Sequence, residues 1–122
     1  MLNLEEIESR KYISLETFKK NNQLVRTPVW FVIKNNLIYV VTREKTGKIK
    51  RLKNNQQVKM ATCTIKGKII GQWFSGNAKF LSEEENRKAI EMRDKKYGIM
   101  AKIAKFLSKG KGDLVAFSIK PD

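Results

Sequence analysis

Apolar and polar positions alternate along most of this chain in runs that predict short strands. The runs cover residues 12–18, 24–33, 37–42, 57–65, 69–81 and 114–119. Period-two alternation with β-branched and aromatic residues is typical of strands. The run at 37–42 is almost continuously apolar, which predicts burial on both faces. Turn residues at 19–23 and 34–36 join the first three runs into a meander, so we expect six strands.

Breaks within two of these runs indicate how the sheet bends. Pro28 lies inside the run at 24–33, and proline cannot donate a ladder hydrogen bond. It therefore predicts a sheet edge, a bulge or a place where the strand leaves the sheet. Gly71 and Gly76 lie inside the run at 69–81 and predict bulges or strong coiling. Long strands bent by glycine are typical of small barrels.

Helical patterns occur in two places. Residues 48–54 predict one or two helical turns. Ser82 followed by Glu85 is a capping box that predicts a helix to about Lys96. Gly98 interrupts it, and a second amphipathic helix is expected where Ile99, Ile103, Phe106 and Leu107 recur at helical spacing. We expect one mainly β domain of α+β class over residues 1–122, a six-stranded barrel with short helices.

The segment 42–55 combines a strand end, a glycine and a helix start rich in lysine and arginine. Free backbone N–H groups and side-chain cations converge in such a turn, which predicts a phosphorylated ligand. The whole chain has 26 Lys and Arg against 12 Asp and Glu, a net charge of +14. This charge favours nucleic acid, an acidic membrane surface or an anionic cofactor. A second basic cluster, between Lys95 and Lys111, has the pattern of a solvated helix face.

The composition argues against a metal site, against a catalytic residue and against a membrane-spanning segment. The chain has no histidine and one cysteine, so we assign neither a metal site nor a catalytic residue and expect a cofactor to supply the chemistry. No apolar stretch is long enough for a membrane span, and the N-terminal residues lack a signal-peptide pattern. We expect a cytoplasmic location and no membrane partner. A chain of 122 residues is short to enclose a ligand alone, which a dimer would remedy.

Five sequence blocks, in this order, resemble the split β-barrel family of the pyridoxamine 5′-phosphate oxidase type, and within it the deazaflavin-dependent oxidoreductases. The blocks are Arg26-Thr-Pro-Val-Trp-Phe31, Tyr39-Val-Val-Thr42, residues 46–55, Trp73-Phe-Ser-Gly-Asn-Ala78 and Tyr97-Gly98. The resemblance implies a homodimeric split barrel with cofactor grooves between the two barrels. Flavins or the deazaflavin coenzyme F-420 would be the cofactors.

The same resemblance implies a set of cofactor-binding residues. The segment Arg26, Thr27, Pro28 and Val29 would run along the ring system, and Val41 and Thr42 would lie beside the ligand. Lys48 and Lys50 would hold the phosphate. Trp73 and Ser75 would approach the cofactor of the opposite subunit. Gly47 stands where a second cation is common, so Arg43, Lys50 or Arg51 would have to replace it. The residues leave Trp30 open between cofactor wall and core.

The implied activity is hydride transfer between a reduced deazaflavin and a small organic substrate that the sequence does not select. The basic stretch from Arg43 to Lys68 suits the phosphodiester and poly-glutamate tail of coenzyme F-420, and FMN is the alternative. Gly47 and the end of the sequence at Asp122, without the family's Trp- and Arg-bearing extension, argue against vitamin B6 oxidation. A cofactor carrier of the same fold is a further alternative. A nucleic-acid-binding barrel using Tyr39, Trp73 and Phe74 is a more distant one, and non-specific attraction is expected from charge alone.

Overall fold

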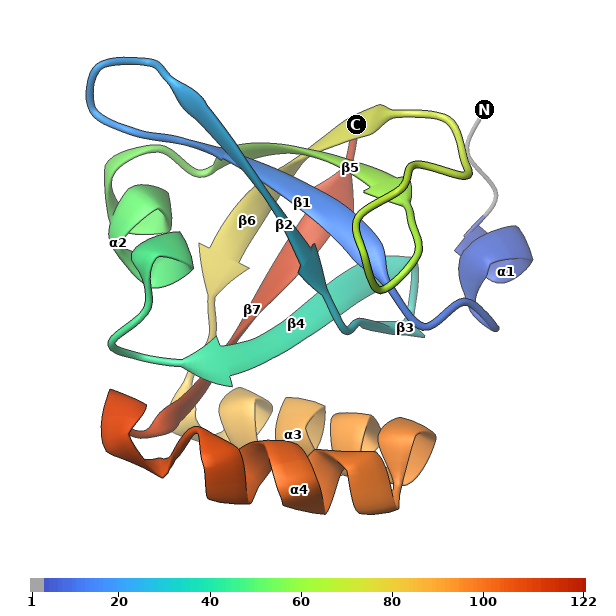
Figure 1. Ribbon diagram of the computed structural model, residues 1–122, viewed down its shortest axis with the longest axis vertical. Coiled ribbons are helices and arrows are strands. Elements are labelled where there is room, and N and C mark those ends of the chain that lie inside the picture. The colour runs from blue at the N-terminus through green and yellow to red at the C-terminus, as the bar shows by residue number, and fades with distance from the viewer. Residues whose placement is uncertain (1–3) are drawn as a thin grey trace.

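The computed structural model describes residues 4–122 and contains seven strands, joined by short helices (Figure 1). The strands are β1 Ile13–Phe18, β2 Leu24–Val29, β3 Val32–Lys34, β4 Leu37–Arg43, β5 Gln57–Thr62, β6 Phe74–Phe80 and β7 Leu114–Pro121. The helices are α1 Leu4–Ile7, α2 Gly47–Asn54, α3 Glu83–Tyr97, α4 Ile99–Leu107 and the 3-10 turn η1 Lys109–Lys111. This is the expected α+β class.

One antiparallel sheet contains all seven strands in the order β2-β1-β5-β6-β7-β4-β3. Strands β2 and β3 are its two opposite edges, yet only Trp30 and Phe31 separate them in the chain. Two residues span only about 7 Å, so the sheet must curl until its edges nearly meet. The result is a barrel that is open between β2 and β3. We call Trp30 and Phe31 the crossover.

The expectation of six strands is therefore wrong by one, and the reason is the run at 24–33. It forms two strands because its first half pairs with β1, whereas its second half pairs with β4. Pro28 lies on the edge strand β2, opposite Ser14, where a missing N–H interrupts no second ladder. This confirms the interpretation of Pro28 as an edge residue that precedes the opening.

The run at 69–81 is also shorter as a strand than the alternation indicated. Strand β6 begins at Phe74, and residues 69–73 form a loop beside the end of β5. The Ile70 N–H donates to the Thr62 carbonyl at 2.9 Å, and Ile69 forms an isolated bridge with Cys63. Gly76 has a packing role in β6. A Cβ atom there would lie 2.7 Å from the carbonyl oxygen of Lys120, so only glycine allows β6 and β7 to approach this closely.

The barrel interior holds the main hydrophobic core. Its fully buried members include Ile13, Leu15, Ile38, Val40, Met60, Phe117 and Ile119. Helix α2 adds Ile49 and Leu52, which close the core beside β1. Strand β4 is less covered than its apolar run predicted, because Leu37, Tyr39 and Val41 on the alternate positions are only half-buried.

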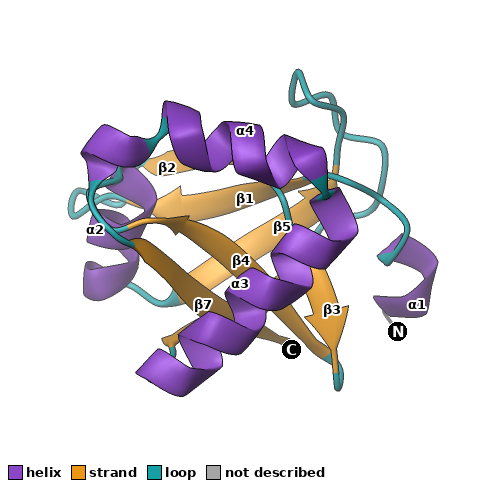
Figure 2. Ribbon diagram, turned by 90° about the horizontal axis from the view of Figure 1, so that it is seen from below, coloured by secondary structure: helices purple, strands orange, loops and turns teal. Residues whose placement is uncertain are grey.

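Helices α3 and α4 form a layer on the side of β3, β4 and β7, seen below the sheet in Figure 1 and facing the viewer in Figure 2. The predicted capping box is present, because the Glu85 N–H donates to the Ser82 hydroxyl and the Ser82 N–H to the Glu85 carboxylate. Gly98 separates the helices with φ +58°, as its position indicated. A small apolar cluster of Val32, Tyr97 and Ala101 joins this layer to the sheet.

Candidate functional site

A groove of about 310 Å³ opens at the split in the barrel and joins elements from across the chain. Strand β2 and the crossover form one wall, β4 and the start of α2 form another, and α3, α4 and η1 complete it. The lining residues are Tyr12, Pro28, Val29, Trp30, Val41, Thr42, Arg43, Thr46, Lys48, Arg93, Ala104, Ser108, Lys111 and Leu114. We call this cavity the groove. Five of the eleven predicted site residues line it, namely Pro28, Val29, Val41, Thr42 and Lys48.

The ring of Trp30 forms a flat part of the groove wall. It stacks on the ring of Tyr97, with centroids 4.3 Å apart and planes 9° from parallel. Trp30 is half-buried and lines the groove. The sequence left Trp30 open between a core residue and a wall of the cofactor site. One face of its ring packs on Tyr97 of α3, and the residue also borders the groove. A flat aromatic surface of this kind suits a planar ligand.

Tyr97 holds the crossover in place. Its hydroxyl accepts a hydrogen bond from the Phe31 N–H at 3.0 Å and donates to the Lys11 carbonyl at 2.7 Å. Burial raises the pKa of Tyr97 to about 12, although its hydrogen bond with Phe31 acts in the opposite direction. The phenol is thus a neutral hydrogen-bonding group at physiological pH and fixes the β2 side of the groove.

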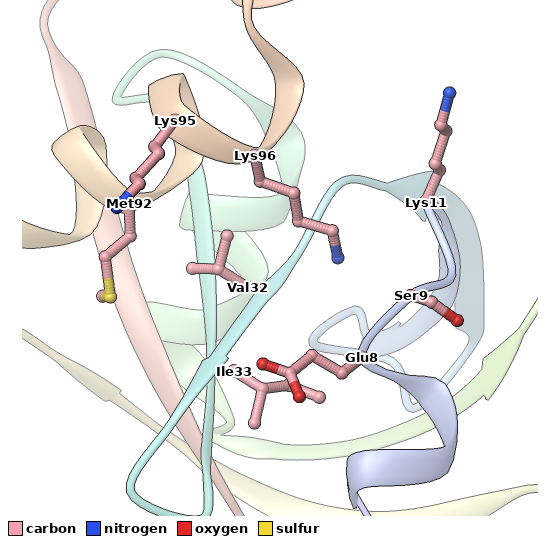
Figure 3. A pocket seen from close by; sticks show the side chains of 8 residues that line it. All are labelled: Glu8, Ser9, Lys11, Val32, Ile33, Met92, Lys95 and Lys96. Atoms are coloured by element: carbon pink, nitrogen blue, oxygen red, sulfur yellow. The ribbon is translucent and has the colours of Figure 1, made fainter.

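Lys96 also binds the crossover. It lines a separate cavity of about 400 Å³ (Figure 3). Its amino group donates to the carbonyls of Phe31 at 2.9 Å and Arg10 at 2.8 Å, and lies 4.0 Å from the centre of the Phe31 ring. Burial lowers the pKa of Lys96 to about 8, although Glu8 acts in the opposite direction. This cavity shares no lining residue with the groove.

The opposite end of the groove is cationic. Thr46 and Lys48 line it at the start of α2, whose N-terminus has no side-chain cap because the Thr46 hydroxyl donates to the Arg43 carbonyl instead. Burial lowers the pKa of the Lys48 amine, and the cations Arg51 and Lys111 lower it further. Among residues 4–122 no ion pair includes Lys48. A bound anion would relieve this repulsion and meet the free N–H groups of α2.

The two arginines that line the groove already have protein partners. Arg43 donates to the Ser108 hydroxyl at 2.9 Å and to the carbonyls of Lys105 and Gly112 at 3.0 and 3.1 Å. It thereby ties the end of β4 to α4 and η1. Arg93 is buried and forms an ion pair with Asp94 at 3.0 Å. The cation that joins Lys48 is instead Lys111, which the sequence pattern had assigned to a solvated face.

Lys50 and Arg51 lie outside the groove, contrary to the expectation that Lys50 holds the same phosphate. Arg51 donates to the Thr17 hydroxyl at 2.6 Å and borders a cavity of about 320 Å³ with Lys19, Lys20 and Lys50. A guanidinium nitrogen of Arg51 lies 2.6 Å from where a Cβ of Gly47 would stand. Arg51 is thus the cation that occupies the space of the side chain missing at Gly47.

Basic side chains continue past the groove around the start of α2. A further cavity of about 410 Å³ is lined by Lys45, Lys50 and Lys53, with Glu44 as its one acidic residue. It shares Thr46 with the groove, and Gly47 and Lys50 with the Arg51 cavity. We call the basic residues of these two cavities, together with Thr46 and Gly47, the α2 path.

The remaining predicted residues, Arg26, Thr27, Trp73 and Ser75, do not line the groove of their own chain. Arg26 binds Glu16 at 3.0 Å and places its guanidinium 4.7 Å from the centre of the Trp73 ring. Thr27 is half-buried on β2, and Ser75 is exposed on β6. Within a single chain the structure thus separates these residues from the other predicted ligands.

Sequence reasoning missed Tyr12, Arg93, Ala104, Ser108, Lys111 and Leu114 as groove residues. Each comes from a segment far from the basic turn in the chain. The packing of α3, α4 and η1 brings Arg93, Ala104, Ser108 and Lys111 there, Leu114 pairs with Arg43 of β4, and Tyr12 precedes β1. Ser108 and Lys111 had no local pattern that distinguishes them from surface residues. Tyr12 had one usable signal, because an aromatic residue directly before an apolar strand often borders a site or core.

The aromatic residues proposed for a nucleic-acid surface are dispersed by the fold. Tyr39 packs against the cluster of Tyr97 and Ala101 beneath the helical layer, and Phe74 packs against the barrel core. Of the three, Trp73 alone belongs to the exposed large apolar residues. Stacking platforms need several exposed rings in a row, so this arrangement argues against that alternative. No helix among residues 4–122 is long and apolar enough to cross a membrane.

Comparison with known proteins supports the fold and places the chain in a family. Three solved structures of similar fold have sequence identities too low to show more than the fold. The heme storage protein HutZ from Vibrio cholerae has a TM-score of 0.74 at 17% identity, covering 98% of this chain and 87% of HutZ. An F-420 reductase has a TM-score of 0.65 at 14% identity, and the match covers 97% of this chain and 92% of the reductase. An FAD-binding protein from Mesorhizobium loti has a TM-score of 0.64 at 16% identity, and the match covers 100% of this chain and 91% of the FAD-binding protein.

No curated protein sequence matches the chain. The family model described as pyridoxamine 5′-phosphate oxidase matches residues 3–122, which is nearly the whole chain. The protein therefore belongs to the pyridoxamine 5′-phosphate oxidase family of split β-barrels.

Proposed function

We propose that the protein binds a flavin-type cofactor in the groove and acts as an oxidoreductase that transfers hydride to or from a small organic substrate. The observation that carries this proposal is the pairing of two features in one cavity. One end has the flat Trp30 ring beside the β2 segment Pro28–Val29, and the other has Lys48 at an uncapped helix start. A planar ring system with a phosphate on a side chain matches both ends.

The residues present fit such a cofactor in their chemistry. Thr46, Lys48 and Lys111 would hold its phosphate, and Val41 and Thr42 would lie beside its polyol chain. Pro28, Val29 and Trp30 would contact the ring and keep water from it. The bound cofactor supplies the hydride chemistry, so the chain's own task is to bind, orient and shield. Histidine is absent from the chain, in keeping with this division.

We favour coenzyme F-420 over FMN because cationic residues extend beyond the groove. The α2 path leads from Thr46 past Gly47 to Lys50, Arg51, Lys19 and Lys20. FMN ends in a phosphate monoester and would leave these cations unused, whereas a phosphodiester with a poly-glutamate tail would reach them. The similar fold of an F-420 reductase is compatible with this preference.

A second subunit would complete the site. A groove of about 310 Å³ is at the small end of the range of about 300–1,000 Å³ for cofactor sites. Trp73 and Ser75 lie outside the groove of their own chain and are exposed. In a homodimer these two residues would approach the cofactor held by the partner and cover its open side.

Titration of the purified protein with each cofactor tests the proposal. We expect saturable binding of coenzyme F-420 with micromolar affinity, weaker binding of FMN, and still weaker binding of the deazaflavin riboside that lacks phosphate and tail. Tighter binding of FMN than of F-420 would overturn the cofactor preference. Absence of binding by both at moderate salt would overturn the oxidoreductase proposal itself.

The carrier alternative is separated from the enzyme by turnover. If the protein is an enzyme, at least one compound in a panel of electron-poor organic substrates should oxidise reduced F-420 bound to the protein faster than it oxidises free reduced F-420. Tight binding with no acceleration across the panel would assign the protein to cofactor storage or transport. HutZ, named as a heme storage protein, shows that a similar fold serves such a purpose in another protein.

A further inference from the structure

Helix α4 has an unusual distribution of side-chain size. Its inward positions hold Ala101, which is fully buried, Ala104, which lines the groove, and the half-buried Met100, which packs on the Tyr97 cluster. Its other four large apolar residues are mostly exposed, with Ile99 73%, Ile103 54%, Phe106 69% and Leu107 77% exposed. We call these four residues the α4 outer face. The predicted amphipathic helix is present, but these four residues of its apolar stripe are in solvent rather than in the core.

The α4 outer face is a continuous ridge rather than a set of scattered residues. Ile99, Ile103 and Phe106 are spaced by four and three positions, so they lie on one side of the helix, and Leu107 follows directly. None of these residues lines the four cavities described above. Figures 1 and 2 show α4 on the outside of the molecule, with no other element of residues 4–122 drawn over its outer side.

Cations surround this ridge. Between Lys95 and Lys111 the chain has six lysines and no acidic residue. Lys96 and Lys105 are engaged with the crossover and with Asp94. Lys102 and Lys109 are exposed beside the outer face, and the Lys109 amine lies 5.2 Å from the centre of the Phe106 ring. Outward Ile, Phe and Leu flanked by lysines are the composition of helices that lie in a lipid interface.

We propose that the α4 outer face docks the protein on an anionic lipid surface. The apolar ridge would enter the boundary between headgroups and acyl chains, and Lys102 and Lys109 would bind lipid phosphates. A helix of nine residues is too short to span the bilayer, so the association is peripheral. The earlier expectation of no membrane partner considered only spanning segments, and the outward direction of the ridge is a tertiary feature.

Charge and shape favour lipid over the other occupants. A second copy docked on this face by its own α4 outer face would bring its Lys102 and Lys109 against the same two lysines. Four side chains are also few compared with the roughly 20–30 residues per side of a stable interface. Nucleic acid would match the lysines, but its phosphate backbone offers nothing to four large apolar side chains.

Flotation of the full-length protein with lipid vesicles tests this proposal. At a salt concentration of about 150 mM, we expect binding to vesicles that contain phosphatidylglycerol and little binding to pure phosphatidylcholine. The double variant Ile103→Ser with Phe106→Ser should bind at least about tenfold more weakly. It should keep the circular dichroism spectrum of the parent because both side chains are exposed. The matched control Ile65→Ser with Ile70→Ser changes exposed isoleucines elsewhere and should bind like the parent.

Three outcomes would overturn the proposal. Failure of the parent protein to bind phosphatidylglycerol vesicles would remove it directly. Equal binding by the Ile103→Ser, Phe106→Ser variant would show that net charge alone causes the attraction. Conversion of a dimer into a monomer by the same variant, measured by sedimentation without lipid, would assign the face to a second copy of the chain.

Discussion

Lys48 is the residue on which the phosphate end of the groove depends. Its pKa is lowered, first by burial and then by Arg51 and Lys111, and no acidic partner offsets its charge among the ion pairs of residues 4–122. Placing an unpaired cation in such a position is unfavourable in the free protein. The favourable contact arises only when an anion enters the groove, as expected of a ligand-binding residue.

Replacing Lys48 should therefore weaken binding without weakening the fold. We expect Lys48→Gln to lower the affinity for F-420 and FMN about 10–100-fold, the value of one charge-assisted contact. Its melting temperature should equal or exceed that of the parent. Lys34→Gln, which removes an exposed lysine on β3 outside the described cavities, is the control and should bind normally. Isothermal titration calorimetry measures the affinities.

Lys50 provides a sharper comparison, because it lies on the α2 path and not in the groove. Lys50→Gln should weaken the binding of F-420 several-fold through its tail and leave FMN unaffected. Equal weakening of both cofactors would place Lys50 at the shared phosphate, as the sequence resemblance implied. No effect on either would argue against the α2 path as a tail site.

At the scale of elements, the C-terminal end of α3 positions the β2 wall of the groove. Lys96 and Tyr97 both hydrogen-bond the backbone of Phe31 in the crossover, and Tyr97 stacks on Trp30. One helix end thus sets where the sheet opens and where the flat wall of the groove stands. Both residues have shifted pKa values, so the strength of this attachment depends on pH.

The pH dependence of Lys96 has a definite sign. Its pKa is about 8 in the folded protein and near 10.5 when exposed, so the unfolded chain binds more protons between these values. Stability therefore rises with pH over this window. Without solvent screening, this pKa difference would change the free energy of unfolding by about 3 kcal/mol. Screening of the half-buried amine reduces the change to about 1–2 kcal/mol. Tyr97, with its pKa raised to about 12, acts oppositely only above about pH 10.

Urea unfolding at about pH 7 and about pH 9.5 measures this effect. The gain in the free energy of unfolding between the two conditions should be about 1 kcal/mol smaller in Lys96→Met than in the parent, because a pH of about 9.5 lies inside the window and only part of the effect is reached. Comparing variants cancels the general relief of positive charge repulsion at high pH. The neighbouring exposed residue supplies the control, and Lys95→Met should keep the parental gain. An identical gain in Lys96→Met would show that Lys96 is not the titrating group.

At the scale of the whole molecule, two exposed apolar features are assigned to proposed partners. Trp73 is exposed in the loop that leads into β6, and the α4 outer face is exposed on the helical layer. Trp73 belongs with the proposed homodimer, because it is among the residues expected to reach the partner's cofactor. The α4 outer face belongs with the proposed lipid surface.

Two measurements test the proposed homodimer: the molecular mass in solution, and the cofactor affinity of one pair of variants. Sedimentation equilibrium should give the mass of two chains at micromolar concentration. Trp73→Ala should weaken cofactor binding about tenfold or more, although Trp73 lies outside the groove of its own chain. Phe80→Ala is the matched control because Phe80 is 38% exposed at the other end of β6, compared with 37% for Trp73. A monomer with normal cofactor affinity in Trp73→Ala would contradict the shared site.

Several local features could be determined from the sequence because short-range chemistry decides them. The turn at Asn35 and Asn36 has positive φ at both residues, and the Ser82 capping box and the break at Gly98 are where their patterns predicted them. The basic turn between β4 and α2 was likewise identified, since a strand end, a glycine and a helix start are contiguous. Pro28, Val29, Val41, Thr42 and Lys48 were predicted to bind one cofactor, and all five line the groove.

Other features were decided only by the tertiary structure. Alternation predicts strands but not their partners, so the run at 24–33 gave no sign that its halves pair at opposite edges of the sheet. Charge along the chain likewise could not distinguish Lys111 in the groove from Lys50 outside it, because that depends on how α4 and η1 pack against β4. The same packing turned the four residues of the α4 outer face outward. Short-range chemistry along the chain is enough to predict the local elements and the cationic turn, whereas contacts between distant segments set which side chains meet.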